Sequence, residues 1–149
     1  DAALFAVGRL FFPAQAAPAG PSEGSWPNHE PLAFAAILAG EQHPWLAKAR
    51  PVDAWDAKGL ALGVLERLGL RAEVRALEGN AVPRHLHPRA AAELHVDGAL
   101  VGTFGLLHPD LVVAFDLAKE TAVVCLDGEA IGRLGAKTPR HAPLPRFPG

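Results

Sequence analysis

The stretch AAAELHVDGALVGTFGLLH, residues 90–108, decides the fold that the sequence predicts. It places Asp97 and Gly98 between the apolar runs ELHV and ALVGTFGLL. A two-residue Asp-Gly link between such runs is the strongest short-range signal for a β-hairpin. The strands of a hairpin run antiparallel, so this stretch predicts an antiparallel sheet. We also expect Gly102 and Gly105 to lie where the strand bends or where another backbone comes close.

Further strands are predicted on both sides of this hairpin. They are expected at residues 3–13, 32–40, 71–79 and 121–127, where apolar residues run together or alternate with polar ones. The second of these runs is continuously apolar, which predicts burial on both of its faces. Gly8 is expected at a bulge or a close backbone approach in the first. Because tight turns rather than crossover helices join consecutive strands, the sequence predicts an α+β fold, an antiparallel β-sheet with flanking helices.

The clearest helix is predicted over VDAWDAKGLALGVLERLGL, residues 52–70. Asp53 can cap the first amides, Asp56 adds negative charge to the first turn, and Gly69 supplies the stop. We favour this capping role for the two aspartates over acid–base chemistry. Apolar residues recur at helical spacing and predict one buried stripe. The stripe comprises Leu60, Val64, Leu65 and Leu68. Shorter helices are expected at residues 109–117 and 128–134.

Length and composition predict one folded unit. The chain has 149 residues, which is the usual size of a single domain. We expect that domain over residues 1–142, with a surface loop at 13–31 and a proline-rich linker at 143–149. Half of the residues are hydrophobic, 20% are charged and the net charge is −2, which excludes a disordered tail and a broadly basic nucleic-acid binder. The chain begins at Asp1 and contains no methionine, so we expect a piece of a longer protein.

The sequence also bears on compartment and redox chemistry. No apolar run approaches the roughly 20 residues that span a bilayer, and no leader sequence is recognisable, so we expect a cytoplasmic protein without membrane contact. Cys125 is the only cysteine and lies in the apolar run TAVVCLDG. It is predicted to be a buried core thiol, because free cysteine packs as a small hydrophobic residue.

Seven histidines raise the possibility of a metal site. His85, His87 and His95 fall close together in the sequence, and His85 and His87 share a face if their segment is extended. No carboxylate or further histidine completes a metal-binding pattern, so we expect no metal ligand among them. The plainer interpretation of the two His-Pro pairs is structural, because proline restricts the residue before it and stops a strand or starts a helix.

Side chains for catalysis are equally sparse. Ser22 and Ser25 are the only serines, and both fall in the expected loop without a nucleophile-elbow pattern. No glycine-rich phosphate-binding motif is present. Arg140 and Arg146 in the tail are expected to be solvated rather than bound to nucleic acid. The sequence therefore predicts no catalytic, cofactor-binding or metal-binding residue. One alternative stays open, a free-standing small α+β enzyme or binding domain with a histidine-based metal site.

Four short motifs resemble the β chain of bacterial phenylalanyl-tRNA synthetases, in the family's order. They are LFAVGRLF at residues 4–11, VDAWDAKG at 52–59, HPRAAAELHVDGALVGTFGLLHPDL at 87–111 and PLPRFPG at 143–149. The positions that carry the family signature are Gly8, Arg9, Asp56, Lys58, Gly59, His87, Pro88, Gly102, Gly105, His108 and Pro109. Each motif is weak alone, but their order and distances make the resemblance specific.

The resemblance implies a sheet like that of class II aminoacyl-tRNA synthetases. Enzymes of this family are α2β2 tetramers in which the α chain activates phenylalanine with ATP and charges tRNA. The F-R-x-E and G-x-G-x-x-x-R motifs of class II active sites are absent here, which implies a noncatalytic structural module that supports assembly. The implied partners are the α chain and, through other domains of the parent, tRNA-Phe. ATP and Mg²⁺ would belong to the parent complex rather than to this piece.

Overall fold

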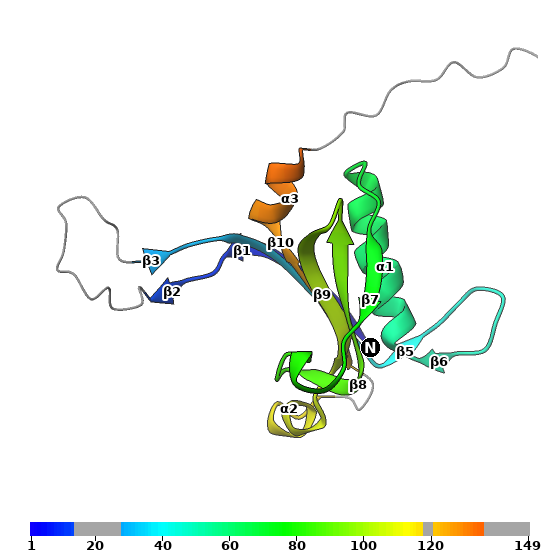
Figure 1. Cartoon of the computed structure of the whole chain (residues 1–149). Coiled ribbons are helices and arrows are strands. Elements are labelled where there is room, and N and C mark those ends of the chain that lie inside the picture. Colours follow the sequence, from blue (N-terminus) through cyan, green and yellow to red (C-terminus); the bar gives the residue numbers. More distant parts are fainter. Residues whose placement is uncertain (14–27, 118–120, 136–149) are drawn as a thin grey trace, which may run out of the picture.

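An antiparallel sheet forms the centre of the molecule. The structure, a computed structural model, describes residues 1–13, 28–117 and 121–135. Within these residues lies a six-stranded sheet in which every neighbouring pair is antiparallel (Figure 1). From edge to edge the strands are β1 (Ala2–Arg9), β4 (Leu32–Ala39), β10 (Thr121–Asp127), β9 (Ala99–Leu107), β8 (Leu86–Val96) and β7 (Glu73–Ala76). The helices are α1 (Ala54–Arg67), α2 (Pro109–Ala114) and α3 (Gly128–Leu134), with a short 3-10 helix η1 (Gly79–Ala81). The predicted α+β fold is confirmed.

Two short strand pairs accompany the sheet. β2 (Phe12–Pro13) pairs with β3 (Asn28–His29), so the strand predicted at residues 3–13 is divided between β1 and β2. β5 (Glu41–Gln42) pairs with β6 (Arg50–Pro51).

Some predictions fall where the structure gives no description. Residues 14–27 of the expected loop and the expected linker at 143–149 lie outside the described residues. In the described part of the chain, no helix combines the length and the hydropathy that crossing a membrane requires.

The hairpin between β8 and β9 is the predicted one. The two strands pair as far as Val96 and Ala99, which leaves Asp97 and Gly98 as a two-residue turn. Both turn residues have a positive φ, 49° and 83°. A type I′ turn needs this left-handed backbone at both central positions, and its twist matches that of the flanking strands. The Asp-Gly sequence therefore fixes the antiparallel pairing of the neighbouring strands.

Two glycines let β9 lie close to both of its neighbours. A Cβ at Gly102 would meet the carbonyl oxygen of Cys125 in β10, and one at Gly105 would meet the carbonyl oxygen of Ala90 in β8. The predicted close approach at these two glycines is confirmed. The same prediction for Gly8 is wrong, because β1 pairs regularly with β4 through this residue and a Cβ there would have nothing within 4 Å.

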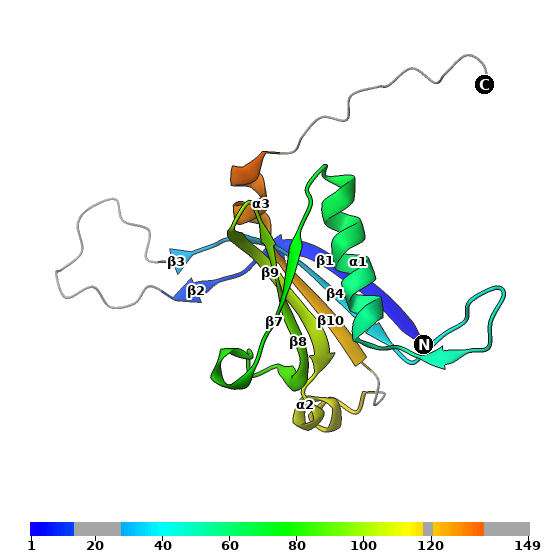
Figure 2. The same cartoon turned by 45° about the vertical axis from the view of Figure 1, so that its right-hand side comes forward.

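The core lies on one face of the sheet. Side chains alternate between the two faces of each strand, and one row is buried where α1 and α3 pack against the same core (Figure 2). The large apolar side chains with the least exposure are Val52, Leu65, Leu86, Leu94, Val96, Val101, Val124 and Leu126. In β8 and β9 the opposite row is mostly half-buried, and in β10 it includes exposed residues. The sheet is therefore covered mainly on one side.

Two predictions are wrong because the sheet is buried mainly on one face. Cys125 is exposed rather than buried in the core, because it alternates with the buried Val124 and Leu126 along β10 and so belongs to the opposite row. Burial on both faces of residues 32–40 was also expected, but within β4 only Ala36 is buried. The physical reason is that β4 is next to the edge strand, where little structure covers its second face.

Helix α1 has the predicted start and stop. Asp53 is its N-cap, and Gly69 follows the C-cap with a φ of 74°. The buried face of the helix is made by Ala57, Ala61 and Leu65, with Leu60 and Val64 partly buried beside them. Leu68 was expected in the buried stripe but is 37% exposed, since the helix has already ended at this residue. The small alanines bring the helix close to β9 and β10.

We predict that Gly105→Ala destabilises the protein, whereas Gly63→Ala in α1 stabilises it. The added methyl group at position 105 would overlap backbone atoms of β8, and such overpacking typically costs about 1–3 kcal/mol. A Cβ at position 63 has nothing within 4 Å, and alanine is favoured over glycine in a helix by about 1 kcal/mol. Urea unfolding of the two variants and the wild type measures both effects. Equal stability of Gly105→Ala and the wild type would contradict the close approach.

We predict that Cys125 reacts with iodoacetamide in the folded protein. Although Cys125 is exposed, neighbouring atoms shield its thiol from part of the solvent, and this desolvation raises the pKa of the thiol. The thiolate is the reactive form, so the pH at which alkylation reaches half its maximal rate should lie above the value of about 8.5 for free cysteine. Mass spectrometry of time courses at several pH values measures this rate. If Cys125 were alkylated only in denaturant, the thiol would be buried in the folded protein and the exposed position would be contradicted.

Candidate functional site

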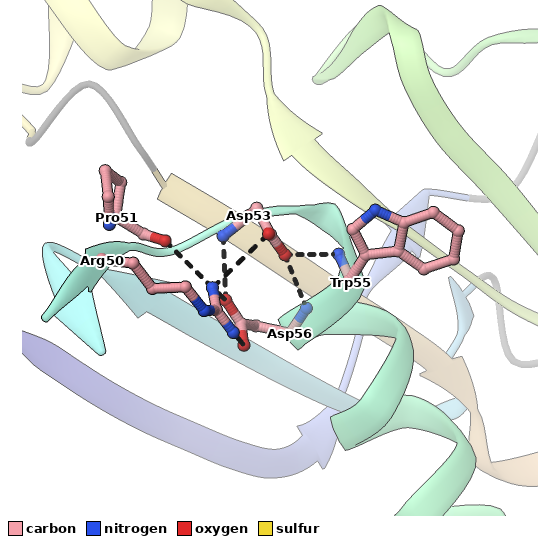
Figure 3. A network of polar contacts seen from close by, with 5 residues as sticks. All are labelled: Arg50, Pro51, Asp53, Trp55 and Asp56. Carbon is pink, nitrogen blue, oxygen red and sulfur yellow. Dashed lines mark hydrogen bonds and ion pairs between the residues drawn. The ribbon is translucent and has the colours of Figure 1, made fainter. Parts of the chain in front are cut away.

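A polar network joins β6 to the start of α1 (Figure 3). The Arg50 guanidinium donates from Nη1 and Nη2 to the two carboxylate oxygens of Asp56, at 2.8 and 2.7 Å. Its Nη1 also donates to the carbonyl oxygen of Pro51 at 3.1 Å and lies 3.4 Å from Oδ2 of Asp53. Two parallel hydrogen bonds between a guanidinium and a carboxylate fix the orientation as well as the distance. The network therefore holds β6 in a defined position against the helix.

The two aspartates of this network also cap the helix. Oδ1 of Asp53 accepts hydrogen bonds from the backbone N–H groups of Trp55 and Asp56, at 2.8 and 3.1 Å. In return, Oδ2 of Asp56 accepts from the backbone N–H of Asp53 at 2.9 Å. This reciprocal arrangement is a capping box, which satisfies amides that the first turn leaves unpaired. The predicted capping role of Asp53 and Asp56 is confirmed.

Charge pairing shifts the acidity of both partners. The hydrogen bond from Arg50 is the main reason that the pKa of Asp56 lies below its ordinary value, with a further lowering contribution from the backbone of Asp53. The hydrogen bond to Asp56 likewise raises the pKa of Arg50. Each partner stabilises the charged form of the other. The pair therefore stays ionised at neutral pH.

A second set of contacts holds β5, the strand that pairs with β6. We name residues 41–51, from β5 to β6, the β5–β6 arm. The Asp1 carboxylate accepts a hydrogen bond from the backbone N–H of Glu41 at 2.8 Å and lies 2.9 Å from Nε2 of His43. The backbone N–H of Val52 donates to the carbonyl oxygen of Gly40 at 2.9 Å. The arm is thus attached to the body near both of its ends.

The signature residue Lys58 lies beside an exposed indole. Its Nζ is 4.9 Å from the ring centroid of Trp55, which is a cation–π distance. The Trp55 side chain is 71% exposed. Both residues line a shallow hollow of about 210 Å³ together with Arg89. Gly59, the next signature position, is unobstructed, since a Cβ there would have nothing within 4 Å.

The signature pair His87-Pro88 lies within β8 rather than at its end. Nδ1 of His87 accepts a hydrogen bond from the backbone N–H of Arg89 at 3.1 Å. The pairing of β8 with β9 is irregular between Leu86 and Ala91, and this irregularity accommodates a proline that cannot donate to the ladder. The prediction that this pair stops a strand is wrong.

The other signature positions have local structural roles. His108 is the N-cap of α2, and its Nδ1 accepts from the backbone N–H of Asp110 at 3.3 Å. Pro109 is the first residue of that helix, so the predicted start of a helix at this His-Pro pair is confirmed. Arg9 in β1 donates from Nη1 to the carbonyl oxygen of Glu30 at 2.8 Å.

The structure does not bring His85, His87 and His95 together as ligands. Nε2 of His95 lies 2.9 Å from Oε2 of Glu93, and Nε2 of His85 is buried without a hydrogen-bond partner. Among residues 1–13, 28–117 and 121–135, no three or more His, Cys, Asp or Glu side chains form a group that could hold a metal ion. The alternative of a histidine-based metal site is not favoured. Ser22, Ser25, Arg140 and Arg146 lie outside the described residues.

Sequence reasoning missed the apolar surface along the edge strand. We name it the β1 surface, and its residues are Leu4, Phe5, Val7, Leu10 and Phe11, which are 65, 75, 62, 49 and 70% exposed. The Phe5 ring stacks on that of Phe34 with centroids 6.1 Å apart. Beside them, β1, β4 and α1 line a hollow of about 500 Å³. The apolar run predicted a strand, but only the topology shows that this strand is an uncovered edge.

We predict that Asp56→Asn lowers the free energy of unfolding at pH 7 by about 1 kcal/mol, because the neutral amide cannot form the charge-assisted pair with Arg50. Because the pKa of Asp56 is depressed in the folded state, its stabilising contribution is present above the unfolded pKa of about 3.9 and disappears as the pH falls through the lower folded value. The variant should therefore lose less stability on acidification than the wild type. Thermal unfolding between neutral and acidic pH measures this difference.

Glu66→Gln, an exposed carboxylate near the other end of α1, is the matched control. It should leave the stability at pH 7 close to that of the wild type. Identical pH profiles for Asp56→Asn and the wild type would show that the Arg50–Asp56 pair contributes nothing to stability.

Comparison with known proteins identifies the family. Residues 1–139 match the family model described as the phenylalanyl tRNA synthetase beta chain CLM domain. The phenylalanine–tRNA ligase beta subunit of Moorella thermoacetica is 35% identical over 147 residues, which cover 98% of this chain and 17% of that protein. The subunit of the same name from Staphylococcus epidermidis is 34% identical over 148 residues, again 98% of this chain and 17% of the relative.

A cyanobacterial relative agrees with these two. The phenylalanine–tRNA ligase beta subunit of a Synechococcus strain is 37% identical over 118 residues, 78% of this chain and 14% of the relative. The chain thus spans at most 17% of the length of these relatives. Since the family model covers residues 1–139, and three of the four motifs lie in described elements, at β1, at the start of α1 and in β8, β9 and α2, the chain belongs to the phenylalanyl-tRNA synthetase β chain family.

Proposed function

We propose that this chain is a noncatalytic structural module of a phenylalanyl-tRNA synthetase β chain. In this proposal its sheet corresponds to that of a class II synthetase, and it helps an α2β2 enzyme to assemble in the cytoplasm. The α subunit performs the ATP- and Mg²⁺-dependent charging of tRNA with phenylalanine. Other parts of the β chain contact the tRNA.

The β1 surface is the observation that carries this proposal. Large apolar side chains that a small protein leaves exposed along one edge often mark a place where another protein binds. Phe5 and Phe11 are 75 and 70% exposed although both are large aromatic residues. β1 is also an edge strand, and an uncovered apolar edge invites pairing or packing with further protein. A module whose task is to dock other parts of an assembly accounts for this surface.

The lining of the open face agrees with a noncatalytic role. One hollow is formed mainly by apolar residues of β1, β4 and β10, including Leu4, Ile37 and Val123. A second is formed mainly by apolar residues such as Leu10 and Leu100, with Asp127 as its acidic member. Transfer reactions of nucleoside triphosphates depend on cations and directed hydrogen-bond donors that stabilise phosphate charge. His85 and Thr103 are further polar members of these two hollows, but neither hollow is lined by a Lys or Arg side chain that could stabilise phosphate charge.

We predict that the purified chain gives no aminoacylation when mixed with phenylalanine, ATP, Mg²⁺ and tRNA-Phe. The same mixture should become active when an intact enzyme of the family is added, which serves as the positive control. Incorporation of labelled phenylalanine into acid-precipitable tRNA measures the reaction. Turnover by the chain alone would contradict a noncatalytic role.

We further predict that the chain binds the purified α subunit of a phenylalanyl-tRNA synthetase. Phe5→Lys should weaken this binding, because a charge placed on the β1 surface would have to be desolvated in the complex. Val113→Lys, which alters an 81% exposed side chain of α2, is the control and should bind as the wild type does. Isothermal titration calorimetry measures the three affinities. Failure of the wild-type chain to bind the α subunit would refute the assembly role.

A further inference from the structure

The tip of the β5–β6 arm carries the two most exposed large apolar side chains among the described residues. Trp45 is 95% exposed and Leu46 is 90% exposed. They lie in a turn closed by a hydrogen bond from the backbone N–H of Ala47 to the carbonyl oxygen of Pro44, at 3.4 Å. Figures 1 and 2 show the arm projecting from the end of the sheet, away from the rest of the body. Residues 1–13, 28–117 and 121–135 therefore leave both side chains uncovered.

An exposed tryptophan next to an exposed leucine is costly to leave in water. Burial of one large apolar side chain is worth roughly 1.5–3 kcal/mol. Tryptophan is also among the residues most enriched at the energetic centres of protein interfaces, where it fills a pocket of the partner. The pair at the arm tip therefore has the character of an interface anchor.

The base of the arm restricts where its tip can go. The Arg50–Asp56 pair fixes β6 against the capped end of α1. The Asp1 carboxylate holds β5 through the backbone of Glu41 and the side chain of His43. A segment whose backbone is already held at its base loses less conformational entropy when it binds. The arm thus presents its tip with a reduced entropic cost of docking.

Charge at the tip limits the chemistry of the partner. Lys48 is exposed two residues after Leu46, whereas the acidic groups Asp1 and Glu41 lie at the base of the arm. A pocket rimmed by carboxylates complements this arrangement. Anionic membranes are a poorer match, because their recognition takes clusters of about 4–8 basic residues.

We propose that Trp45 and Leu46 insert into an apolar pocket with an acidic rim on the α subunit. This inference rests on the proposed function and adds the contact that anchors the two subunits. The β1 surface then supplies a broader apolar contact area, while the arm supplies a localised anchor.

The test compares binding of the wild-type chain and of the double variant Trp45→Ala, Leu46→Ala to the purified α subunit by calorimetry. We expect the double variant to bind at least about 30-fold more weakly, the loss typical of a strong interface anchor. Phe115→Ala, which removes a 69% exposed aromatic ring at the end of α2, is the matched control and should leave the affinity unchanged. The melting temperature of the double variant should equal that of the wild type, since the two side chains are almost fully exposed.

A second measurement follows the indole directly. Binding of the α subunit should protect part of the tryptophan fluorescence from quenching by iodide, and this protected part should be missing in Trp45→Phe. If the wild type and the double variant bind with the same affinity, the anchor is refuted while the assembly role stands. If the wild type does not bind, the assembly role fails and the anchor with it. Equal loss of affinity in Phe115→Ala, or arm-dependent binding to phosphatidylserine vesicles without binding to the α subunit, also overturns the inference.

Discussion

The close approach of β9 to its two neighbours is the constraint on which the sheet depends. Gly102 and Gly105 remove the side chains that would otherwise meet Cys125 on one side and Ala90 on the other. β9 therefore links the β8–β9 hairpin to β10, and β10 in turn pairs with β4. Without the contact between β9 and β10, the sheet would separate into β1, β4 and β10 on one side and β7, β8 and β9 on the other. The local turn at Asp97 and Gly98 starts the pairing, and the glycines allow it to continue across the molecule.

Burial on one side of this sheet explains both stability and exposure. α1 and α3 cover one row of side chains, so that Leu94, Val101 and Val124 are almost completely removed from water. A small domain has limited structure with which to cover a second face. Apolar residues of β1 consequently stay exposed at the edge, where they form the β1 surface. The chain uses its helices to build a stable core and leaves apolar area available for other protein.

The start of α1 couples local and long-range structure. Asp53 and Asp56 satisfy the first amides of the helix, which is a local task that many sequences perform. Arg50 extends this capping box to β6 and thereby gives the β5–β6 arm a fixed origin. The residues that cap α1 therefore also hold the base of the β5–β6 arm. The exposed tip, Trp45 and Leu46, and the β1 surface are separate apolar features of one scaffold.

Residues that are close together in the chain were sufficient to predict the local structure. Four features follow from residues near one another in the chain. They are the Asp97-Gly98 turn, the capping box of α1, the helix start at His108-Pro109 and the antiparallel pairing of the strands. The four family motifs likewise sufficed to indicate the family. Tertiary structure decided the rest, because exposure depends on which strands become neighbours. Apolar runs and spacing alone could not predict three features. These are the exposure of Cys125, the inclusion of His87-Pro88 in β8 and the absence of a shared metal site among the three histidines in the described residues. An apolar run looks the same whether its strand lies in the centre of a sheet or at an edge, so only the order of the strands revealed the uncovered surface of β1.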